Sequence, residues 1–362
     1  MFYSTYMRAS SLLISGRDGI ARALDAAILY ELGKIPVPLP SAVSFDRIDP
    51  EEFWRQSRIH DPAPVGVVRE VGLRDHGRVR MVDLEGPSSG PGVHPGSRKL
   101  IARAHIRTDL PNAPTVILLH GFAIPNPLWE GWQCRILTAR GVNAIRLDHP
   151  FHLRRRARGM LSGEGYLSAE PRGVCRAMRQ SAEDAAALVS WARANLGSSV
   201  SVLGVSLGGG TACQLAALTE LSSMVAIAPF CDPAATLTER LPRQLRRGFG
   251  VAGESYGFWG NDLPSAQAAM SDALAPIVAR NLGTPRTPAS RIALVKPTLD
   301  RIVGPDPITE LGRAWGCEPW EMRDGHISVM NAPGLMRRVY SFLLDGNDGV
   351  AVDAAAEVRL AG

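Results

Sequence analysis

Short, continuous apolar runs alternate with segments of helical periodicity from residue 115 onward. Such runs are typical of strands buried on both faces, as in a mainly parallel sheet covered by helices. The strands expected on this basis are 115–119, 143–147, 200–204, 224–228, 291–295 and a weaker one near Trp320. The helices expected between and after them are 129–140, 177–196, 209–218 and 334–344. The pattern predicts the α/β fold class, with a mainly parallel central sheet flanked by helices.

The residues before 113 follow a different pattern. Apolar side chains recur at helical spacing over 16–33 and Gly33 then provides a helix stop, so a helix is expected there. Three runs typical of β-structure, 65–71, 79–84 and 100–106, predict antiparallel strands that continue the sheet. We interpret 1–112 as an N-terminal extension that caps a site, mediates dimerisation or extends the sheet, and the sequence does not choose among these roles.

Composition limits the class of protein. A chain of 362 residues, 45% of them hydrophobic, can bury a substantial core without disulfides. The five cysteines are scattered and include no C-x-x-C pair, so we expect reduced thiols and no zinc site. No stretch reaches the roughly 18 apolar residues of a membrane span, and the apolar stretch near residue 12 is too short for a signal peptide. We therefore expect a soluble, cytoplasmic protein.

The sequence GVSLG at 204–208 matches the pattern G-x-S-x-G. It directly follows the apolar run 200–203 and directly precedes a helical segment that opens with two further glycines. A sharp strand-to-helix turn needs small residues on both sides of the serine, because the backbones pass closely while the hydroxyl projects outward. The helix N-terminus also favours negative charge that develops nearby. This context predicts that Ser206 is a nucleophile.

This element and its surroundings resemble the α/β-hydrolase superfamily of serine esterases and lipases over about 115–344. The resemblance implies the α/β-hydrolase fold, with a cap insertion between two parts of the core. The segments expected are a core at 113–232 and 291–345, a cap or lid at 233–290 and a flexible tail at 346–362.

The resemblance also implies an oxyanion hole. His120-Gly121-Phe122 follows the apolar run 116–119 and is similar to the turn that supplies one oxyanion amide in this family. By this resemblance, the backbone amides of Phe122 and Leu207 would hold the charge that develops in the transition state. His120 itself is expected to support the turn and to take no part in the chemistry.

In this family the general base follows the nucleophile along the chain, and the acid lies between them. Of the eight histidines, only His326 follows Ser206, and it lies between the weak strand near Trp320 and a helix. For the acid, Asp300 follows the strand 291–295 in a segment similar to the family's D-x-I-V pattern. Two other acids stay open as alternatives: Asp232, which follows the preceding strand, and Asp306, which lies six residues after Asp300.

These residues predict two-step acyl transfer through an acyl-enzyme on Ser206, with neither a metal nor an organic cofactor. The expected substrate is a carboxylic ester, including lipid and anionic esters. Two alternatives stay open: an acyltransferase or peptidase on the same scaffold, and a non-catalytic binding protein that keeps the fold.

Substrate contacts are predicted from two groups of residues. The loop 148–158 is rich in arginine and follows a strand, where α/β enzymes bind ligands, so Arg154 and Arg155 are candidates for pairing with an anionic substrate. A solvated arginine-rich loop is the alternative. The aromatic side chains of Trp129 and Trp259 are candidates for an apolar acyl pocket, with ordinary core packing as their alternative.

The formal net charge of +5 comes mainly from arginine, since Lys34, Lys99 and Lys296 are the only lysines. The arginines are spread along the chain without a nucleic-acid-binding motif, so nucleic acid is not an expected partner. The expected partner is a small-molecule or lipid ester, and a homodimer is left open.

Overall fold

The computed structural model describes residues 17–36, 46–74, 77–88, 95–168, 170–237 and 263–344. These residues form a sheet of nine strands in the order β1-β2-β3-β5-β4-β6-β7-β8-β9. The strands are β1 (Gly66–Arg74), β2 (Val79–Pro87), β3 (Lys99–Arg107), β4 (Thr115–Leu119), β5 (Asn143–Asp148), β6 (Val200–Val205), β7 (Met224–Ile227), β8 (Ile292–Pro297) and β9 (Trp320–Met322).

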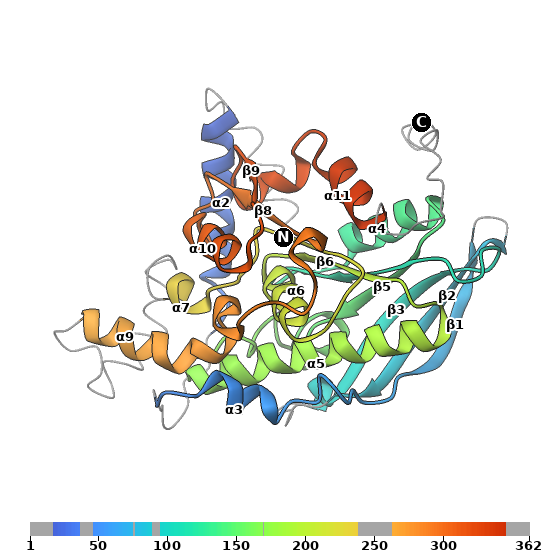
Figure 1. The fold of residues 1–362 in the computed structure, drawn as a ribbon, viewed down its shortest axis with the longest axis horizontal. Helices are drawn as coiled ribbons and strands as arrows, with labels where there is room; N and C mark the ends of the chain where they lie inside the picture. Colours follow the sequence, from blue (N-terminus) through green and yellow to red (C-terminus); the bar gives the residue numbers. More distant parts are fainter. Residues whose placement is uncertain are drawn as a thin grey trace.

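Strand direction divides the sheet into two parts. The pairs β1–β2, β2–β3 and β3–β5 are antiparallel. The pairs β5–β4, β4–β6, β6–β7, β7–β8 and β8–β9 are parallel. The prediction of a mainly parallel sheet is therefore confirmed, and the three early strands continue it at one edge (Figure 1).

Helices cover both faces of the sheet. On one face lie α5 (Pro171–Asn195), α6 (Leu207–Leu218) and α10 (Asp306–Trp315), and on the other lie α4 (Leu128–Ala139) and α11 (Leu335–Leu344). Ile117 of β4 packs in the first layer and Val116 in the second, as the alternation of side chains along a strand requires. Burial on both faces explains why the strands are apolar throughout.

The remaining helices lie around the carboxyl ends of the parallel strands and along α5. They are α2 (Arg17–Leu32), α3 (Pro50–Arg55), α7 (Pro233–Ala235) and α9 (Leu263–Leu274), with short 3₁₀ turns η2 (Pro95–Arg98), η3 (Leu153–Arg155), η5 (Ala275–Ile277), η6 (Ala279–Leu282), η7 (Ala289–Arg291) and η8 (Ser328–Asn331). In Figure 1, α2 lies beside β9, although the two are far apart in the sequence, and Asp18 of α2 pairs with Arg323 just after β9.

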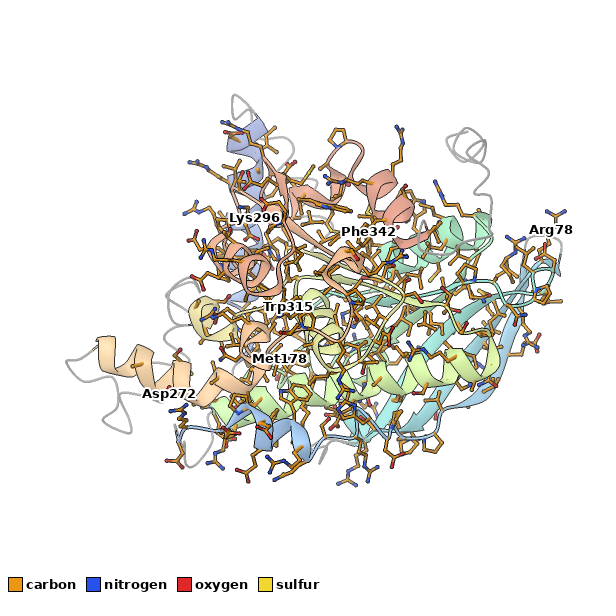
Figure 2. The ribbon with its side chains drawn as sticks, viewed as in Figure 1. Arg78, Met178, Asp272, Lys296, Trp315 and Phe342 are labelled. Atoms are coloured by element: carbon orange, nitrogen blue, oxygen red, sulfur yellow. The ribbon has the colours of Figure 1, made fainter. Side chains whose placement is uncertain are left out.

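The end of α2 and the start of α5 share a third apolar cluster with the loop after β7. Leu32, Val174, Met178 and Phe230 belong to this cluster. Figure 2 shows Met178 within the body of the molecule and Arg78 at its periphery, near the tip of the β1–β2 hairpin. The N-terminal extension thus contributes both edge strands and a helix that packs on the core.

Two further sequence expectations concern the described residues. The five cysteines are buried and unpaired. In the part of the chain that the structure describes, no helix is long and apolar enough to cross a membrane. The expected tail at 346–362 and part of the expected cap, 238–262, lie outside the described residues.

Candidate active site

Ser206 lies at the sharp turn between β6 and α6. Its backbone has φ 52° and ψ −113°, a conformation that is rare for residues other than glycine. The amide of Ser206 donates to the carbonyl of Ile227 at 2.9 Å, and its carbonyl accepts from the amide of Phe230 at 2.9 Å. Bonds to β7 and to the loop that follows it therefore hold the turn in this strained shape.

The two glycines of the motif are required by close backbone contacts. A Cβ atom at Gly204 would lie 2.2 Å from the carbonyl oxygen of Gly208. A Cβ atom at Gly208 would lie 2.1 Å from the carbonyl oxygen of Leu119. Any side chain at either position would force the backbone apart, so the G-x-S-x-G pattern has a steric cause at this turn.

Hydrogen bonds join the three residues that the sequence predicts as a triad. The hydroxyl of Ser206 lies 2.9 Å from Nε2 of His326, and Nδ1 of His326 lies 2.8 Å from Oδ2 of Asp300. His326 and Asp300 are buried, while Ser206 is half-buried and lines a cavity. The structure thus brings together side chains from three separate loops.

The charges of His326 and Asp300 stabilise each other. Burial alone would lower the pKa of His326, but Asp300 and, more weakly, Asp25 outweigh it and the pKa lies above its usual 6.5. Burial would likewise raise the pKa of Asp300, but His326 and the amides of Ile302 and Val303 lower it below its usual value. Asp300 is therefore ionised and can hold the proton of His326 on Nδ1.

The alternative acids do not contact His326. Asp232 caps α7 by accepting from the amide of Ala235 at 3.0 Å, and its other oxygen pairs with Arg280. Asp306 is exposed in the first turn of α10. Of the three acids that the sequence left open, the structure places Asp300 against the base.

The predicted oxyanion turn lies next to Ser206. A Cβ atom at Gly121 would lie 3.6 Å from Cβ of Ser206, so the backbone leading to Phe122 passes close to the nucleophile. The amide of Gly208 donates to the carbonyl of His120 at 3.0 Å, which joins this turn to the start of α6. Leu207 is the first residue of α6, and the first amides of a helix lack intrahelical acceptors.

His120 is buried within the turn. Its Nδ1 donates to the carbonyl of Gly121 at 2.8 Å, and its Nε2 accepts from the amide of His149 at 3.1 Å. Burial lowers the pKa of His120 to about 4, so the ring is neutral near pH 7. Both ring nitrogens are engaged with backbone, as expected for a side chain that holds the turn in place.

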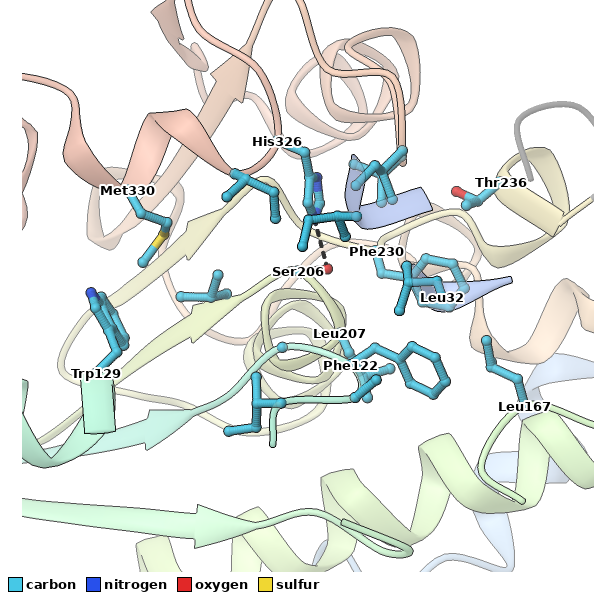
Figure 3. Close-up of a pocket in the computed structure, with 18 of the residues that line it drawn as sticks. Leu32, Phe122, Trp129, Leu167, Ser206, Leu207, Phe230, Thr236, His326 and Met330 are labelled. Carbon is cyan, nitrogen blue, oxygen red and sulfur yellow. Dashed lines mark hydrogen bonds between the residues drawn. The ribbon is translucent and has the colours of Figure 1, made fainter. Parts of the chain in front are cut away.

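A cavity of about 300 Å³ opens beside Ser206 and His326 (Figure 3). Most of its lining is apolar and comes from α2, the oxyanion turn, α4 and the loops after β7 and β8. The apolar lining residues include Ile28, Leu32, Phe122, Trp129, Leu167, Phe230, Leu237, Ile302, Ile327 and Met330. Glu130 also lines it, and burial raises the pKa of that carboxyl to about 7. Such a cavity favours an apolar group of modest size next to the serine.

Trp129 lines this cavity, whereas Trp132 on the same helix is 54% exposed. Trp259, the other aromatic candidate for a substrate contact, lies outside the described residues.

The two candidate arginines form hydrogen bonds and ion pairs within the protein. Arg155 is fully buried, and its guanidinium donates to Asp184 at 2.7 Å and to the carbonyl of Ser97 at 3.0 Å. Arg154 pairs with Asp148 at 2.6 Å and with Asp83 at 2.8 Å. Neither side chain lines the cavity beside Ser206. Both guanidinium groups thus pair with carboxylates of the chain itself, and their contact with a substrate stays a prediction.

One residue near the base was not predicted. Asp25 of α2 is buried, and its carboxylate accepts hydrogen bonds from the amides of His326 and Ile327 at 3.0 and 3.1 Å. It belongs to the buried side of the helix, next to Leu24 and one turn after Ala21. The sequence signal that could have identified Asp25 is an acidic residue within the apolar stripe of a predicted helix.

Among the described residues, no group of three or more histidine, cysteine or acidic side chains is placed to hold a metal ion.

Comparison with known proteins supports the fold. No protein-family model matches the chain, and no curated protein matches it by sequence. Among solved structures, acetyl xylan esterase 1 from Thermoanaerobacterium sp. JW/SL YS485 superposes with a TM-score of 0.61 at 15% identity, covering 88% of this chain and 98% of that one. Acetyl xylan esterase from Paenibacillus sp. R4 gives a TM-score of 0.59 at 14% identity, covering 86% and 99%.

A third similar structure is a cold-adapted esterase from an Arctic intertidal metagenomic library, with a TM-score of 0.50 at 15% identity and coverage of 76% of this chain and 98% of that one. At identities this low, the superpositions establish a shared architecture only, and the activity has to be inferred from the site. The sheet order, the two helical layers and these superpositions show that the chain has the α/β-hydrolase fold.

Proposed function

We propose that the protein hydrolyses a carboxylic ester through an acyl-enzyme on Ser206. The observation that carries this proposal is the continuous hydrogen-bond chain from the Ser206 hydroxyl through His326 to Asp300, at 2.9 and 2.8 Å, beside an apolar cavity. A hydroxyl, a neutral imidazole and an ionised carboxylate in this sequence are the parts of a serine nucleophile with its general base.

In the acylation step, Nε2 of His326 takes the hydroxyl proton as Oγ of Ser206 attacks the acyl carbon. Asp300 holds the other ring proton on Nδ1, so that Nε2 is the nitrogen free to accept, and its charge stabilises the imidazolium that forms. The C–O bond to the leaving alcohol then breaks, and the alcohol takes the proton from Nε2.

The tetrahedral intermediate carries a negative charge on the former carbonyl oxygen. The amides of Phe122 and Leu207 are assigned to this oxygen, because both belong to backbone that borders Ser206. The N-terminus of α6 adds a favourable partial charge. Loss of one such donor typically costs about a hundred- to a thousandfold in turnover.

Deacylation repeats the same proton transfers with water as the nucleophile. Water gives a proton to Nε2 of His326 as its oxygen attacks the acyl carbon, and Oγ of Ser206 recovers that proton when the acid leaves. The enzyme then returns to its starting state with one ester bond hydrolysed.

The cavity favours an ester whose acyl group is apolar and of modest size. Two similar folds belong to acetyl xylan esterases, which is consistent with a short acyl group. Arg154 and Arg155 pair with carboxylates of the chain and do not line the cavity, so the proposal does not include an anionic substrate.

The test is hydrolysis of p-nitrophenyl acetate and butyrate by purified wild-type protein and by the Ser206→Ala variant. Removal of a serine nucleophile should lower kcat by about a millionfold, which leaves a small residual activity above the uncatalysed rate. Ser222→Ala is the matched control, because Ser222 precedes β7 at the opposite end of the strands and should keep near-normal activity. Equal hydrolysis by wild type and Ser206→Ala would overturn the proposal.

A further inference from the structure

The carboxylate of Asp25 is buried and accepts three backbone hydrogen bonds. Oδ2 accepts from the amides of His326 at 3.0 Å and Arg301 at 3.1 Å, and Oδ1 accepts from the amide of Ile327 at 3.1 Å. Asp25 lies on α2, 301 positions before His326 in the chain. A charged acceptor with several amide donors forms stronger hydrogen bonds than a neutral one.

These donors belong to two loops that carry the two partners of Ser206. Arg301 directly follows Asp300, and His326 is itself the predicted base. The two loops also contact each other directly, through the amide of Leu299 and the carbonyl of Asp324 at 3.0 Å. Asp25 therefore fixes both loops at positions adjacent to their functional side chains.

The fit between α2 and the base loop is close. A Cβ atom at Gly325 would lie 3.0 Å from both carboxylate oxygens of Asp25 and 2.9 Å from the carbonyl oxygen of Ala21. A glycine at this position lets the helix approach the loop. Two turns earlier on α2, Asp18 forms an exposed ion pair with Arg323 at 2.6 Å, which adds a second contact to the same loop.

We propose that Asp25 is a positioning residue for the reaction: it holds the His326 loop and the Asp300 loop in register, so that α2 completes the active site. This inference rests on the proposed function of Ser206, His326 and Asp300. A displacement of about 1 Å at a reacting group can cost about a hundredfold in rate, so a group that fixes the base has a large effect without contacting substrate.

Asp25 also contributes charge at the base. The groups that face His326 are Asp300 from the loop after β8, Asp25 from α2 and the hydroxyl of Ser206, while Glu130 of α4 lines the same cavity. Asp300 and Asp25 both raise the pKa of His326 against the lowering effect of burial. Removal of the Asp25 charge should therefore shift the acidic limb of the pH–rate profile to lower pH.

The test compares three variants of the full chain with wild type. Asp25→Asn keeps the size of the side chain, removes the charge and replaces one acceptor oxygen with a donor. Asp25→Glu keeps the charge but is too long for the space against Gly325. Asp18→Asn is the matched control, because it removes an acidic residue of the same helix that contacts the same loop at the surface.

The measurements are kcat and KM for p-nitrophenyl butyrate from pH 5 to 9, with thermal unfolding of each variant. We expect kcat to fall about a hundredfold in Asp25→Asn with little change in KM, and the acidic midpoint to move to lower pH. Asp25→Glu should also lose kcat but keep the wild-type midpoint, and Asp18→Asn should match wild type in both.

Each outcome decides between the two proposals. Ser206→Ala with wild-type activity rejects the proposed function, whereas an inactive Ser206→Ala together with wild-type kcat and midpoint in Asp25→Asn rejects only the role of Asp25. Loss of stability in Asp25→Asn with an unchanged midpoint also rejects the role of Asp25, because replacement of a purely structural residue would give the same result. If Asp25→Asn does not fold, wild-type kcat in Asp25→Glu rejects the role, and reduced kcat with wild-type KM, midpoint and thermal unfolding supports it.

Discussion

Nδ1 of His326 lies 2.8 Å from Oδ2 of Asp300, and both side chains are buried. The other oxygen of Asp300 accepts from the amides of Ile302 and Val303 at 2.8 and 3.0 Å. The carboxylate is thus fixed by its own loop, and its remaining oxygen points at the imidazole. This geometry leaves Nε2 of His326 to accept the proton of Ser206.

The first prediction separates the acids that the sequence left open. Asp300→Asn should lower kcat by about ten-thousandfold, because an amide can hold the imidazole in the wrong tautomer. Asp232→Asn should keep kcat within a few-fold, since Asp232 caps α7 and pairs with Arg280. Steady-state kinetics on p-nitrophenyl butyrate measures both. The reverse result, with Asp232→Asn inactive and Asp300→Asn active, would assign the acid to the other loop.

The second prediction concerns pH. His326 must be neutral to take the serine proton, and its pKa lies above the usual 6.5 because Asp300 and Asp25 outweigh the effect of burial. Activity should therefore fall as the pH drops through that raised pKa, with a midpoint of kcat/KM above pH 6.5. Circular dichroism over the same pH range controls for unfolding. A midpoint below 6.5 in the folded protein would contradict the assigned environment of His326.

Much of the fold and part of the site could be predicted from the sequence because their signals are local. The buried strands are apolar in an unbroken run, and β4 occupies the expected residues 115–119. The turn at Ser206 requires glycine at 204 and 208 for steric reasons, which leaves a mark in the sequence itself. His326 could be selected because it is the only histidine after Ser206.

Other features depend on contacts between distant parts of the chain. Asp300 and Asp232 both follow strands of the parallel sheet, so their local sequences could not decide which carboxylate meets His326. The sequence around Arg155 is typical of a solvated loop, yet Arg155 pairs with Asp184, which is 29 positions away on α5. Local composition does not reveal such pairings. Helix α10 differs from them, because it was not predicted although its helical pattern, which begins with the buried Ile308, is local.

The third prediction concerns the acyl pocket. Leu32 of α2 lines the cavity, so Leu32→Ala should enlarge it and shift the preferred acyl chain of p-nitrophenyl esters to greater length. Each additional buried methylene contributes about 0.8 kcal/mol, so kcat/KM should rise about fourfold per carbon until the new space is filled. Tyr30→Ala on the same helix is the control, because Tyr30 is 59% exposed. An unchanged chain-length profile in Leu32→Ala would show that α2 does not bound the acyl site.

The fourth prediction tests the internal role of Arg155. Arg155→Met removes the partner of buried Asp184 and should lower the free energy of unfolding by about 3–5 kcal/mol. Arg156→Met, at the exposed neighbouring position, should change it by less than about 0.5 kcal/mol. Urea unfolding measures both values. Near-normal stability of Arg155→Met, with a selective loss of activity on anionic esters, would restore Arg155 as a substrate contact.

The central claim is that Ser206 becomes covalently acylated, and labelling with a fluorophosphonate followed by peptide mass spectrometry tests it most directly. Such probes react with a serine that an adjacent base activates. We expect one label per chain, on the peptide that contains Ser206, with none on Ser206→Ala and slow labelling of His326→Ala. A labelled serine elsewhere, or equal labelling of wild type and Ser206→Ala, would contradict it.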